Sequence, residues 1–287
     1  MNNQQNSFYT GWIKWVPNGD EWVELYEKGK TPFIMLENQY LLTYEEDKEG
    51  KQTLTHTYCY EGDKLRKISR GSINISKKRE KDSKVIYPRN DEQICAIDML
   101  LDESKTIKLL TGSWGTGKTM LLVSAALNML NRGRYDRIIW IRNNIDVKDT
   151  KEIGCLPGEV IDKLLPYLGP FIDHVGEDEV KSMISNGSLI VEPLQFLRGR
   201  NFENSIIMCS EAENLTKEHI QLIIARAAEG SIVMFDADNR QRDKAIFEKS
   251  KGIEIMIEKF KGNKLFGYVH LVKGERSETA AMADLLN

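Results

Sequence analysis

A glycine-rich segment with the spacing G-x-x-x-x-G-K-T runs from Gly112 to Thr119. Glycines at its first, fourth and sixth positions allow the backbone to curl so that successive N–H groups face inward, where they can bind phosphate oxygens. Lys118 is then placed to contact the β- and γ-phosphates of a nucleotide, and the Thr119 hydroxyl to bind Mg²⁺. The predicted nucleotide-binding residues of this P-loop are Gly112, Ser113, Trp114, Gly115, Thr116, Gly117, Lys118, Thr119 and Met120.

A second group of reactive side chains follows two later apolar stretches. Residues 204–211 read NSIIMCSE, an apolar strand that ends in an acid, which is the form of a Walker B motif. Glu211 is placed there to polarise an attacking water as general base. The stretch FDADNRQRD puts Asp238, Gln241 and Asp243 after another buried strand, where a residue that senses the γ-phosphate would lie. Together with the P-loop, this order predicts hydrolysis of a nucleoside triphosphate.

Four arginines lie near these segments, and a lone arginine is usually an exposed ion-pair partner. All four, however, lie close in sequence to the predicted strands of one sheet, and this common arrangement favours contacts with a bound nucleotide. They are Arg198, Arg200, Arg226 and Arg276.

Strand and helix patterns alternate from about residue 87 onward. The predicted strands are 107–110, 138–142, 188–193, 204–210, 230–237 and 268–272. The predicted helices are 91–103, 118–131, 217–229 and 252–260. Apolar strands that alternate with helices indicate a parallel sheet covered on both faces. The sequence therefore predicts an α/β fold, a RecA-like P-loop NTPase with a doubly wound parallel sheet.

The N-terminal part has a different pattern. Residues 20–29 (DEWVELYEKG) have helical spacing that ends at Gly29, and residues 33–76 alternate in the manner of a small β unit. Trp and Tyr side chains there could stack on bases, although packing within a small domain is the favoured interpretation. The sequence thus predicts two parts, a mainly β N-terminal region at 1–85 and an ATPase domain at 86–287.

Composition excludes several protein classes. The 287 residues are 41% hydrophobic, enough to fill a core, but no apolar stretch reaches the length of a membrane span. The first residues, MNNQQNSFYTG, lack the basic and apolar regions of a signal peptide. Four cysteines form no C-x-x-C pair and only four histidines are present, so neither a disulfide framework nor a zinc site is indicated. A cytoplasmic enzyme is the expectation.

Positive charge is concentrated between Lys64 and Lys84, where nine Lys or Arg stand against two acids in a chain of net charge −3. A surface that follows the phosphates of a nucleic acid is one interpretation. A solvated linker or hairpin surface is the other, and the run alone favours it because charge runs usually face water.

These motifs resemble the PhoH-type ATPases, RecA-like P-loop proteins related to superfamily 1 helicases. The resemblance covers roughly residues 86–287 and is most specific in the LPG-x-x-x-x-K-x-x-P-Y-x-x-P block. It rests on PRNDEQ (88–93), GSWGTGKT (112–119), Arg142, GCLPGEVIDKLLPYLGPFID (154–173), LRGR (197–200), SEAENLT (210–216), ADNRQRD (237–243) and KGERS (273–277). The earlier YTGW, ELYEKG and ENQYLL resemble the connector before the ATPase in PIN–PhoH fusion proteins, without the acidic quartet of a PIN ribonuclease.

The resemblance implies a hexameric, ATP-driven protein, with RNA unwinding as in the PIN-fused relatives. It implies adenine recognition by Gln93, phosphate and Mg²⁺ binding by Lys118 and Thr119, catalysis by Glu211, γ-phosphate sensing by Gln241, and action of Arg276 at a subunit boundary or on the γ-phosphate. ATP, Mg²⁺ and single-stranded RNA are the expected ligands, with DNA left open.

Three positions depart from the family pattern. Ser210 stands where an Asp normally orients Mg²⁺ through its water shell, Ala237 replaces a Gly, and Asn143 replaces a Pro. A hydroxyl can still bond a metal-bound water but brings no charge, so Ser210 predicts weakened hydrolysis. Three functions stay open: an RNA-directed, helicase-like motor, an ATP-gated scaffold or regulator with a degenerate Walker B motif, and, less favoured, a small-molecule kinase.

Overall fold

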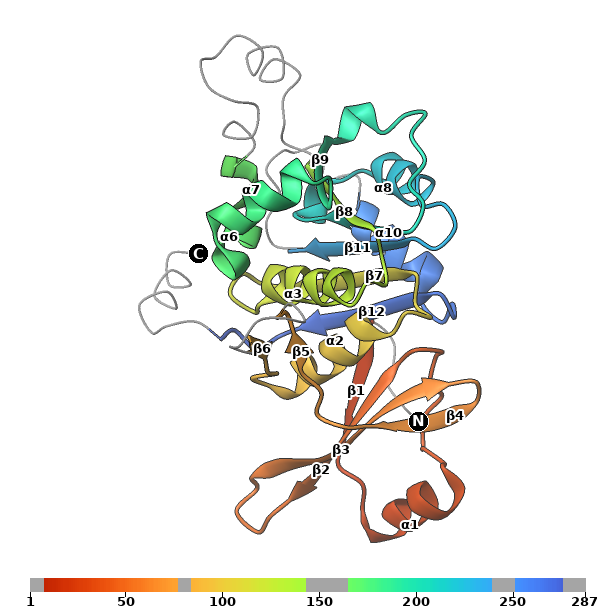
Figure 1. Ribbon diagram of the computed structural model, residues 1–287. Coiled ribbons are helices and arrows are strands. Elements are labelled where there is room, and N and C mark those ends of the chain that lie inside the picture. The colour runs from red at the N-terminus through yellow and green to blue at the C-terminus, as the bar shows by residue number, and fades with distance from the viewer. Residues whose placement is uncertain (1–7, 77–83, 143–164, 239–250, 276–287) are drawn as a thin grey trace, which may run out of the picture.

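A computed structural model describes residues 8–76, 84–142, 165–238 and 251–275, and their largest element is a six-stranded sheet (Figure 1). Its strands are β7 (Ile107–Gly112), β8 (Arg137–Arg142), β9 (Leu189–Pro193), β10 (Ser205–Cys209), β11 (Ile232–Ala237) and β12 (Phe266–Leu271). They lie in the order β12-β7-β11-β10-β8-β9, and every pairing is parallel. The predicted α/β fold with a parallel sheet is confirmed.

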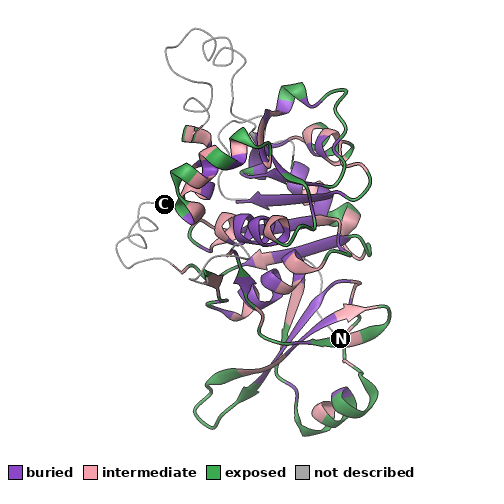
Figure 2. Ribbon diagram, in the orientation of Figure 1, coloured by how far each residue is buried: buried purple, intermediate pink, exposed green. Residues whose placement is uncertain are grey.

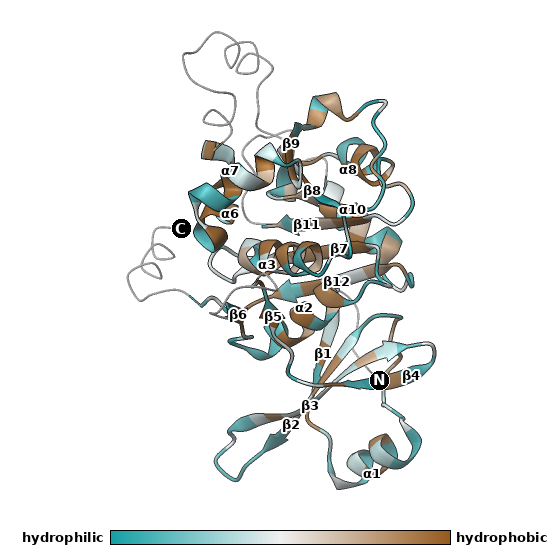
Figure 3. Cartoon of the chain, in the orientation of Figure 1, coloured by the Kyte–Doolittle hydropathy of each residue, from teal (hydrophilic) through white to brown (hydrophobic). Residues whose placement is uncertain are grey.

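Helices cover both faces of this sheet. On β10, Ile206 and Met208 belong to the core on one face, whereas Ile207 and Cys209 belong to the core on the other. The first face carries α2 (Asp91–Leu101), α3 (Lys118–Asn131), α6 (Gly169–Val175) and α7 (Glu177–Ser185), and the second carries α8 (Lys217–Ile224) and α10 (Gly252–Phe260). Figures 2 and 3 show these strands as both buried and hydrophobic. Burial on two sides explains their continuous apolar sequences.

The helices differ from the predicted set in two places. The predicted helix 217–229 ends at Ile224, because the chain beyond it pairs with Phe202 instead of continuing the helix. The N–H of Phe202 donates to the Arg226 carbonyl at 3.0 Å, and the N–H of Ala228 donates to the Phe202 carbonyl at 2.8 Å. The predicted set also lacks α6 and α7, which are short and meet at Gly176, where φ is 83°.

A separate four-stranded sheet precedes the parallel one and lies beside β12 (Figure 1). Its strands, in spatial order, are β1 (Trp12–Trp15), β2 (Tyr40–Glu46), β3 (Gln52–Glu61) and β4 (Lys64–Ile68). The connection from β1 to β2 contains α1 (Gly19–Lys28), which begins with a capping box between Asn18 and Glu21 and ends at Gly29 in the left-handed conformation. A small pair, β5 (Ile73–Asn74) and β6 (Val85–Ile86), leads into α2.

Hydrogen bonds join the N-terminal sheet to the edge of the parallel sheet. The indole Nε1 of Trp12 donates to the His270 carbonyl at 2.8 Å, and the N–H of His270 donates to the Thr10 carbonyl at 2.9 Å. Asn38, only 4% exposed, donates its side-chain amide to the carbonyls of Asn263, Lys264 and Phe266 at 3.0–3.1 Å. The side-chain amide of Asn38 therefore fixes the turn that leads into β12 to the segment before β2.

We expect Asn38→Ala to lower the free energy of unfolding by about 2–4 kcal/mol. The backbone of Asn38 is left-handed, with φ of 65°, so alanine there loses the amide bonds and adds backbone strain. Asn38→Gly is the matched control, since glycine adopts this φ freely and loses only the amide bonds. Urea denaturation measures both variants. An alanine variant within about 0.5 kcal/mol of wild type would show that the link contributes little.

Candidate functional site

The P-loop connects the end of β7 to the start of α3 at the carboxyl edge of the parallel sheet. Gly112 has φ of 151°, and a Cβ atom there would lie 2.3 Å from the Leu271 carbonyl oxygen on the neighbouring strand. Gly117 caps α3 in the left-handed conformation, with φ of 87°. A larger residue at Gly112 would force a shift of the backbone, and one at Gly117 would be strained by its positive φ. Gly115, Gly117 and the first residues of α3 border the same space, where backbone N–H groups and a helix N-terminus can bind a phosphate.

Lys118 lies across this loop. Its Nζ donates to the carbonyl oxygens of Gly112 at 2.7 Å and Ser113 at 2.9 Å. The hydroxyl of Thr116 also donates to the Ser113 carbonyl, at 2.8 Å, which tightens the turn. When a phosphate binds here, Lys118 must leave these two carbonyls and donate to the phosphate oxygens instead.

Gln93 lies behind the loop and is 1% exposed. Its Oε1 accepts the N–H of Arg89 at 2.8 Å, and its Nε2 donates to the Thr116 carbonyl at 3.0 Å. Its own N–H is capped by Asn90 at the start of α2, at 2.9 Å. Gln93 therefore supports the P-loop from behind and does not line the cavity described next. Its role in adenine recognition stays a prediction.

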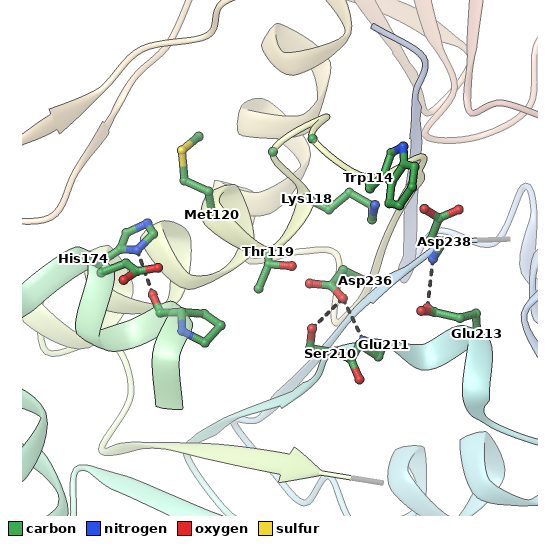
Figure 4. A pocket seen from close by; sticks show the side chains of 14 residues that line it. Trp114, Lys118, Thr119, Met120, His174, Ser210, Glu211, Glu213, Asp236 and Asp238 are labelled. Carbon is green, nitrogen blue, oxygen red and sulfur yellow. Dashed lines mark hydrogen bonds between the residues drawn. The ribbon is translucent and has the colours of Figure 1, made fainter. Parts of the chain in front are cut away.

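A cavity of about 440 Å³ opens between the P-loop and the ends of β10 and β11 (Figure 4). It brings together eight predicted site residues: Trp114, Gly115, Gly117, Lys118, Thr119, Met120, Ser210 and Glu211. Predicted residues Gly112, Ser113, Thr116 and Gln93 do not line it. Asp238, predicted to follow a buried strand near the γ-phosphate, also lines it. Five further lining residues were not predicted: Pro170, Asp173, His174, Glu213 and Asp236. The cavity thus has one wall of glycines and a lysine, and an opposite wall rich in acids.

Asp236 is the buried centre of the acidic wall. Its Oδ1 accepts the Ser210 hydroxyl at 2.9 Å and the N–H of Glu211 at 3.0 Å (Figure 4). Glu211 itself has a left-handed backbone, with φ of 57° and ψ of 42°, and an exposed side chain. Such conformations cost energy in residues other than glycine and often occur at functional sites. The bond from its N–H to Asp236 holds this turn, so that Glu211 stands at the cavity.

Glu213 lies deeper than Glu211, and burial raises its pKa to about 7, with further increases from the charges of Asp236 and Glu211. Its Oε2 accepts the N–H of Asp238 at 2.9 Å, which acts in the opposite direction. Across the cavity, burial lowers the pKa of His174, whose Nδ1 lies 2.8 Å from the Pro170 carbonyl. Near neutral pH this wall therefore carries less negative charge than its count of acids suggests.

Glu213 should make the stability of the protein depend on pH. Because its pKa is higher in the folded protein than the ordinary 4.5, the folded state binds more protons between pH 4.5 and 7. The free energy of unfolding therefore falls as pH rises through that range, by on the order of 2–3 kcal/mol from this group. We expect Glu213→Gln to match wild type near pH 4.5 and to be more stable at pH 8.

Urea denaturation in EDTA at several pH values measures this difference. Glu203→Gln, at an exposed glutamate before β10, is the control and should follow the wild-type curve. A Glu213→Gln variant that keeps the wild-type pH profile would contradict the raised pKa.

The remaining predicted residues fall in two groups. Gln241, Asp243 and Arg276 lie outside the described residues. Arg200 pairs with Glu192 at 2.8 Å, and Arg226 donates to the Arg200 carbonyl at 3.0 Å, so both hold surface segments. Like these two, the predicted Arg198 does not line the cavity as far as the structure describes it.

Comparison with known proteins matches the PhoH-like protein family (PhoH) to residues 85–282. Protein PhoH2 of Bacillus subtilis (strain 168) is 35% identical over 212 residues, which are 70% of this chain and 48% of that protein. Protein PhoH2 of Mycolicibacterium smegmatis is 33% identical, over 68% of this chain and 45% of that protein. Protein PhoH of Escherichia coli (strain K12) is 28% identical, over 67% and 55% respectively. The chain spans about half the length of these curated relatives.

Among solved structures, the flagellar accessory protein FlaH from Methanocaldococcus jannaschii matches 63% of this chain and 77% of that chain, with 10% identity and a TM-score of 0.28. In the described part of the chain, no helix combines the length and the apolar character that crossing a membrane needs. The family match contains the P-loop, the cavity and its acidic wall. This P-loop NTPase chain therefore belongs to the PhoH-like protein family.

Proposed function

We propose that the chain binds ATP with Mg²⁺ and hydrolyses it to ADP and phosphate by breaking the bond between the β- and γ-phosphates. The observation that carries this is the cavity itself, in which Lys118 and Thr119 of the P-loop face Ser210 and Glu211 at the end of β10. Lys118 and the loop N–H groups bind the phosphates, and Glu211 orients the attacking water and accepts its proton. Glu211 suits this role because its strained turn holds an exposed carboxylate at the cavity wall.

The residues around Thr119 fit Mg²⁺. This ion prefers oxygen ligands, keeps several waters, and is often bound by one or two protein oxygens together with substrate phosphates. The Thr119 hydroxyl would be a direct ligand, and Ser210 would bond one of the metal's waters. When bound, Mg²⁺ would neutralise charge on the β- and γ-phosphate oxygens.

We further propose that single-stranded RNA stimulates this ATPase, as in a helicase-like motor. Support comes from the basic segment 64–84, of which the structure describes part. Lys64 and Lys67 are exposed on β4, where a phosphate backbone can reach them. Arg66 instead forms ion pairs with Glu61 and Asp98, at 2.7 and 2.9 Å.

Two other basic side chains of the segment donate to carbonyls, Arg70 to Pro88 at 2.9 Å and Lys84 to His174. Lys77, Lys78, Arg79 and Lys81 lie outside the described residues. We therefore propose that the lysines of β4 and the basic residues of 77–81 contact RNA. The other basic side chains of the segment, Arg66, Arg70 and Lys84, bond to groups of the protein itself.

Phosphate release measured with and without single-stranded RNA tests the proposal. We expect stimulation that weakens as salt rises, because bound lysines and arginines release counterions from RNA. Single-stranded DNA of the same sequence compares the two nucleic acids. ATP binding without stimulated turnover would instead support the second candidate, an ATP-gated scaffold or regulator, which Ser210 favours because it removes one charge from the Walker B position.

Two parts of the proposal concern organisation. We propose a mainly β region at 1–85 and an ATPase domain at 86–287, supported by the two larger sheets, which share no strand. We also propose a homohexamer in which Arg276 acts on a nucleotide of the neighbouring subunit. Assembly mass in solution tests the hexamer, and a monomer with full activity would exclude action of Arg276 across a subunit boundary.

A further inference from the structure

The Walker B position of this chain lacks a carboxylate on β10, yet one lies on the next strand. β10 and β11 are parallel, with Cys209 opposite Phe235. The residues that follow, Ser210 and Asp236, therefore lie side by side at the carboxyl edge of the sheet. We propose that Asp236 supplies the carboxylate that holds the metal-bound waters of the P-loop site, in place of the charge that Ser210 lacks. This inference rests on the proposed binding of ATP with Mg²⁺.

The hydrogen bonds of Asp236 aim it at the cavity. Its Oδ1 accepts two donors, Ser210 Oγ at 2.9 Å and Glu211 N at 3.0 Å, which fix the plane of the carboxylate. Its Oδ2 is buried without a hydrogen-bond partner, and the residue is only 2% exposed. A buried carboxylate oxygen without a donor is costly, and such an atom in a functional cavity calls for a ligand. A metal-bound water is a donor of the required kind.

The two neighbouring glutamates, Glu213 and Glu211, are less suited to this role. Glu213 already gives its Oε2 to the N–H of Asp238 at 2.9 Å, so that its carboxylate braces the backbone after β11. Glu211 is exposed and is positioned to act on water instead. Ser210 keeps a part in the site, because its hydroxyl orients Asp236. Asp236 thus supplies the charge from β11, and Ser210, directly after β10, supplies the hydroxyl that orients it.

The alternative for Asp236 is a purely structural role, in which it only holds the turn at Glu211. Asp236→Asn separates the two, since an asparagine side chain keeps an oxygen that can accept the same two hydrogen bonds but loses the charge. The exchange of Ser210→Asp with Asp236→Ser returns the charge to β10. Ser210→Ala removes a hydroxyl and leaves the carboxylate.

Affinity for a fluorescent, non-hydrolysable ATP analogue, measured in Mg²⁺ and in EDTA, is the test, with Mn²⁺ binding followed by electron paramagnetic resonance. We expect Asp236→Asn to weaken binding about tenfold to hundredfold in metal, because a charge-assisted contact is lost. Its affinity in EDTA should stay within about threefold of wild type. The exchanged pair should recover most of the metal-dependent affinity, and Ser210→Ala should lose less than Asp236→Asn.

Equal losses in metal and in EDTA would assign Asp236 to structure alone and overturn the inference. An unchanged metal dependence in Asp236→Asn would overturn it as well. If Asp236→Asn does not fold, the exchanged pair decides, and a folded exchanged pair without metal-dependent binding contradicts the inference. A wild-type protein that binds no nucleotide would instead overturn the proposed function, which keeps the two failures distinct.

Discussion

Lys118→Ala should weaken binding of Mg²⁺-ATP by about 30-fold to 1,000-fold, which corresponds to a loss of about 2–4 kcal/mol. Lys118 is the P-loop cation at the cavity, and its contacts with phosphate oxygens are charge-assisted. The net loss is smaller than two such bonds, because the lysine must first leave the carbonyls of Gly112 and Ser113. Titration calorimetry measures the affinity, and hydrolysis should fall with it.

Lys28→Ala is the matched control, since Lys28 is an exposed lysine on α1 whose partner is Glu24 on the same helix. It removes the same charge from the chain and should bind ATP as wild type does. Equal affinity of Lys118→Ala and wild type would show that the nucleotide binds elsewhere.

Glu211→Gln should lower the turnover number about 100-fold to 10,000-fold while affinity for ATP stays within about threefold. Glutamine keeps the size of the side chain but cannot accept the proton of an attacking water. The fold should persist, because the turn is held through the N–H of Glu211, which the substitution leaves in place. Phosphate release under saturating ATP measures the turnover.

The variant Glu213→Gln tests whether Glu211 or its neighbour Glu213 is the general base. Glu213 is buried and bonded to the N–H of Asp238, so its loss should slow turnover much less than the loss of Glu211. The reverse order would make Glu213 the general base. Similar losses in both variants would mean that the two acids act as one unit.

Much of the fold follows from local sequence patterns. The apolar runs at 138–142 and 230–237 predict β8 and β11 to within two residues, and the P-loop pattern predicts α3. These elements are predictable because burial on both faces leaves a continuous apolar signal. Strand order and the end of α8 depend on pairing with distant residues, and no local pattern contains that information.

The site is less predictable than the fold for the same reason. Asp236 sits inside the apolar run GSIVMFDA, where its only signal is an acid within an otherwise buried strand. Its closeness to Ser210 arises from the pairing of β10 with β11, which brings residues 26 positions apart into contact. The contacts of Gln93 with the backbone of Arg89 and Thr116 likewise depend on how α2 packs against the loop.

A crystal structure with Mg²⁺ and a non-hydrolysable ATP analogue tests most directly whether this cavity is the nucleotide site. We expect the β- and γ-phosphates within the loop 112–119, Lys118 on their oxygens instead of on the carbonyls of Gly112 and Ser113, and the metal between Thr119 and the acidic wall. Nucleotide bound elsewhere, with Lys118 still bonded to those carbonyls, would contradict the proposed site.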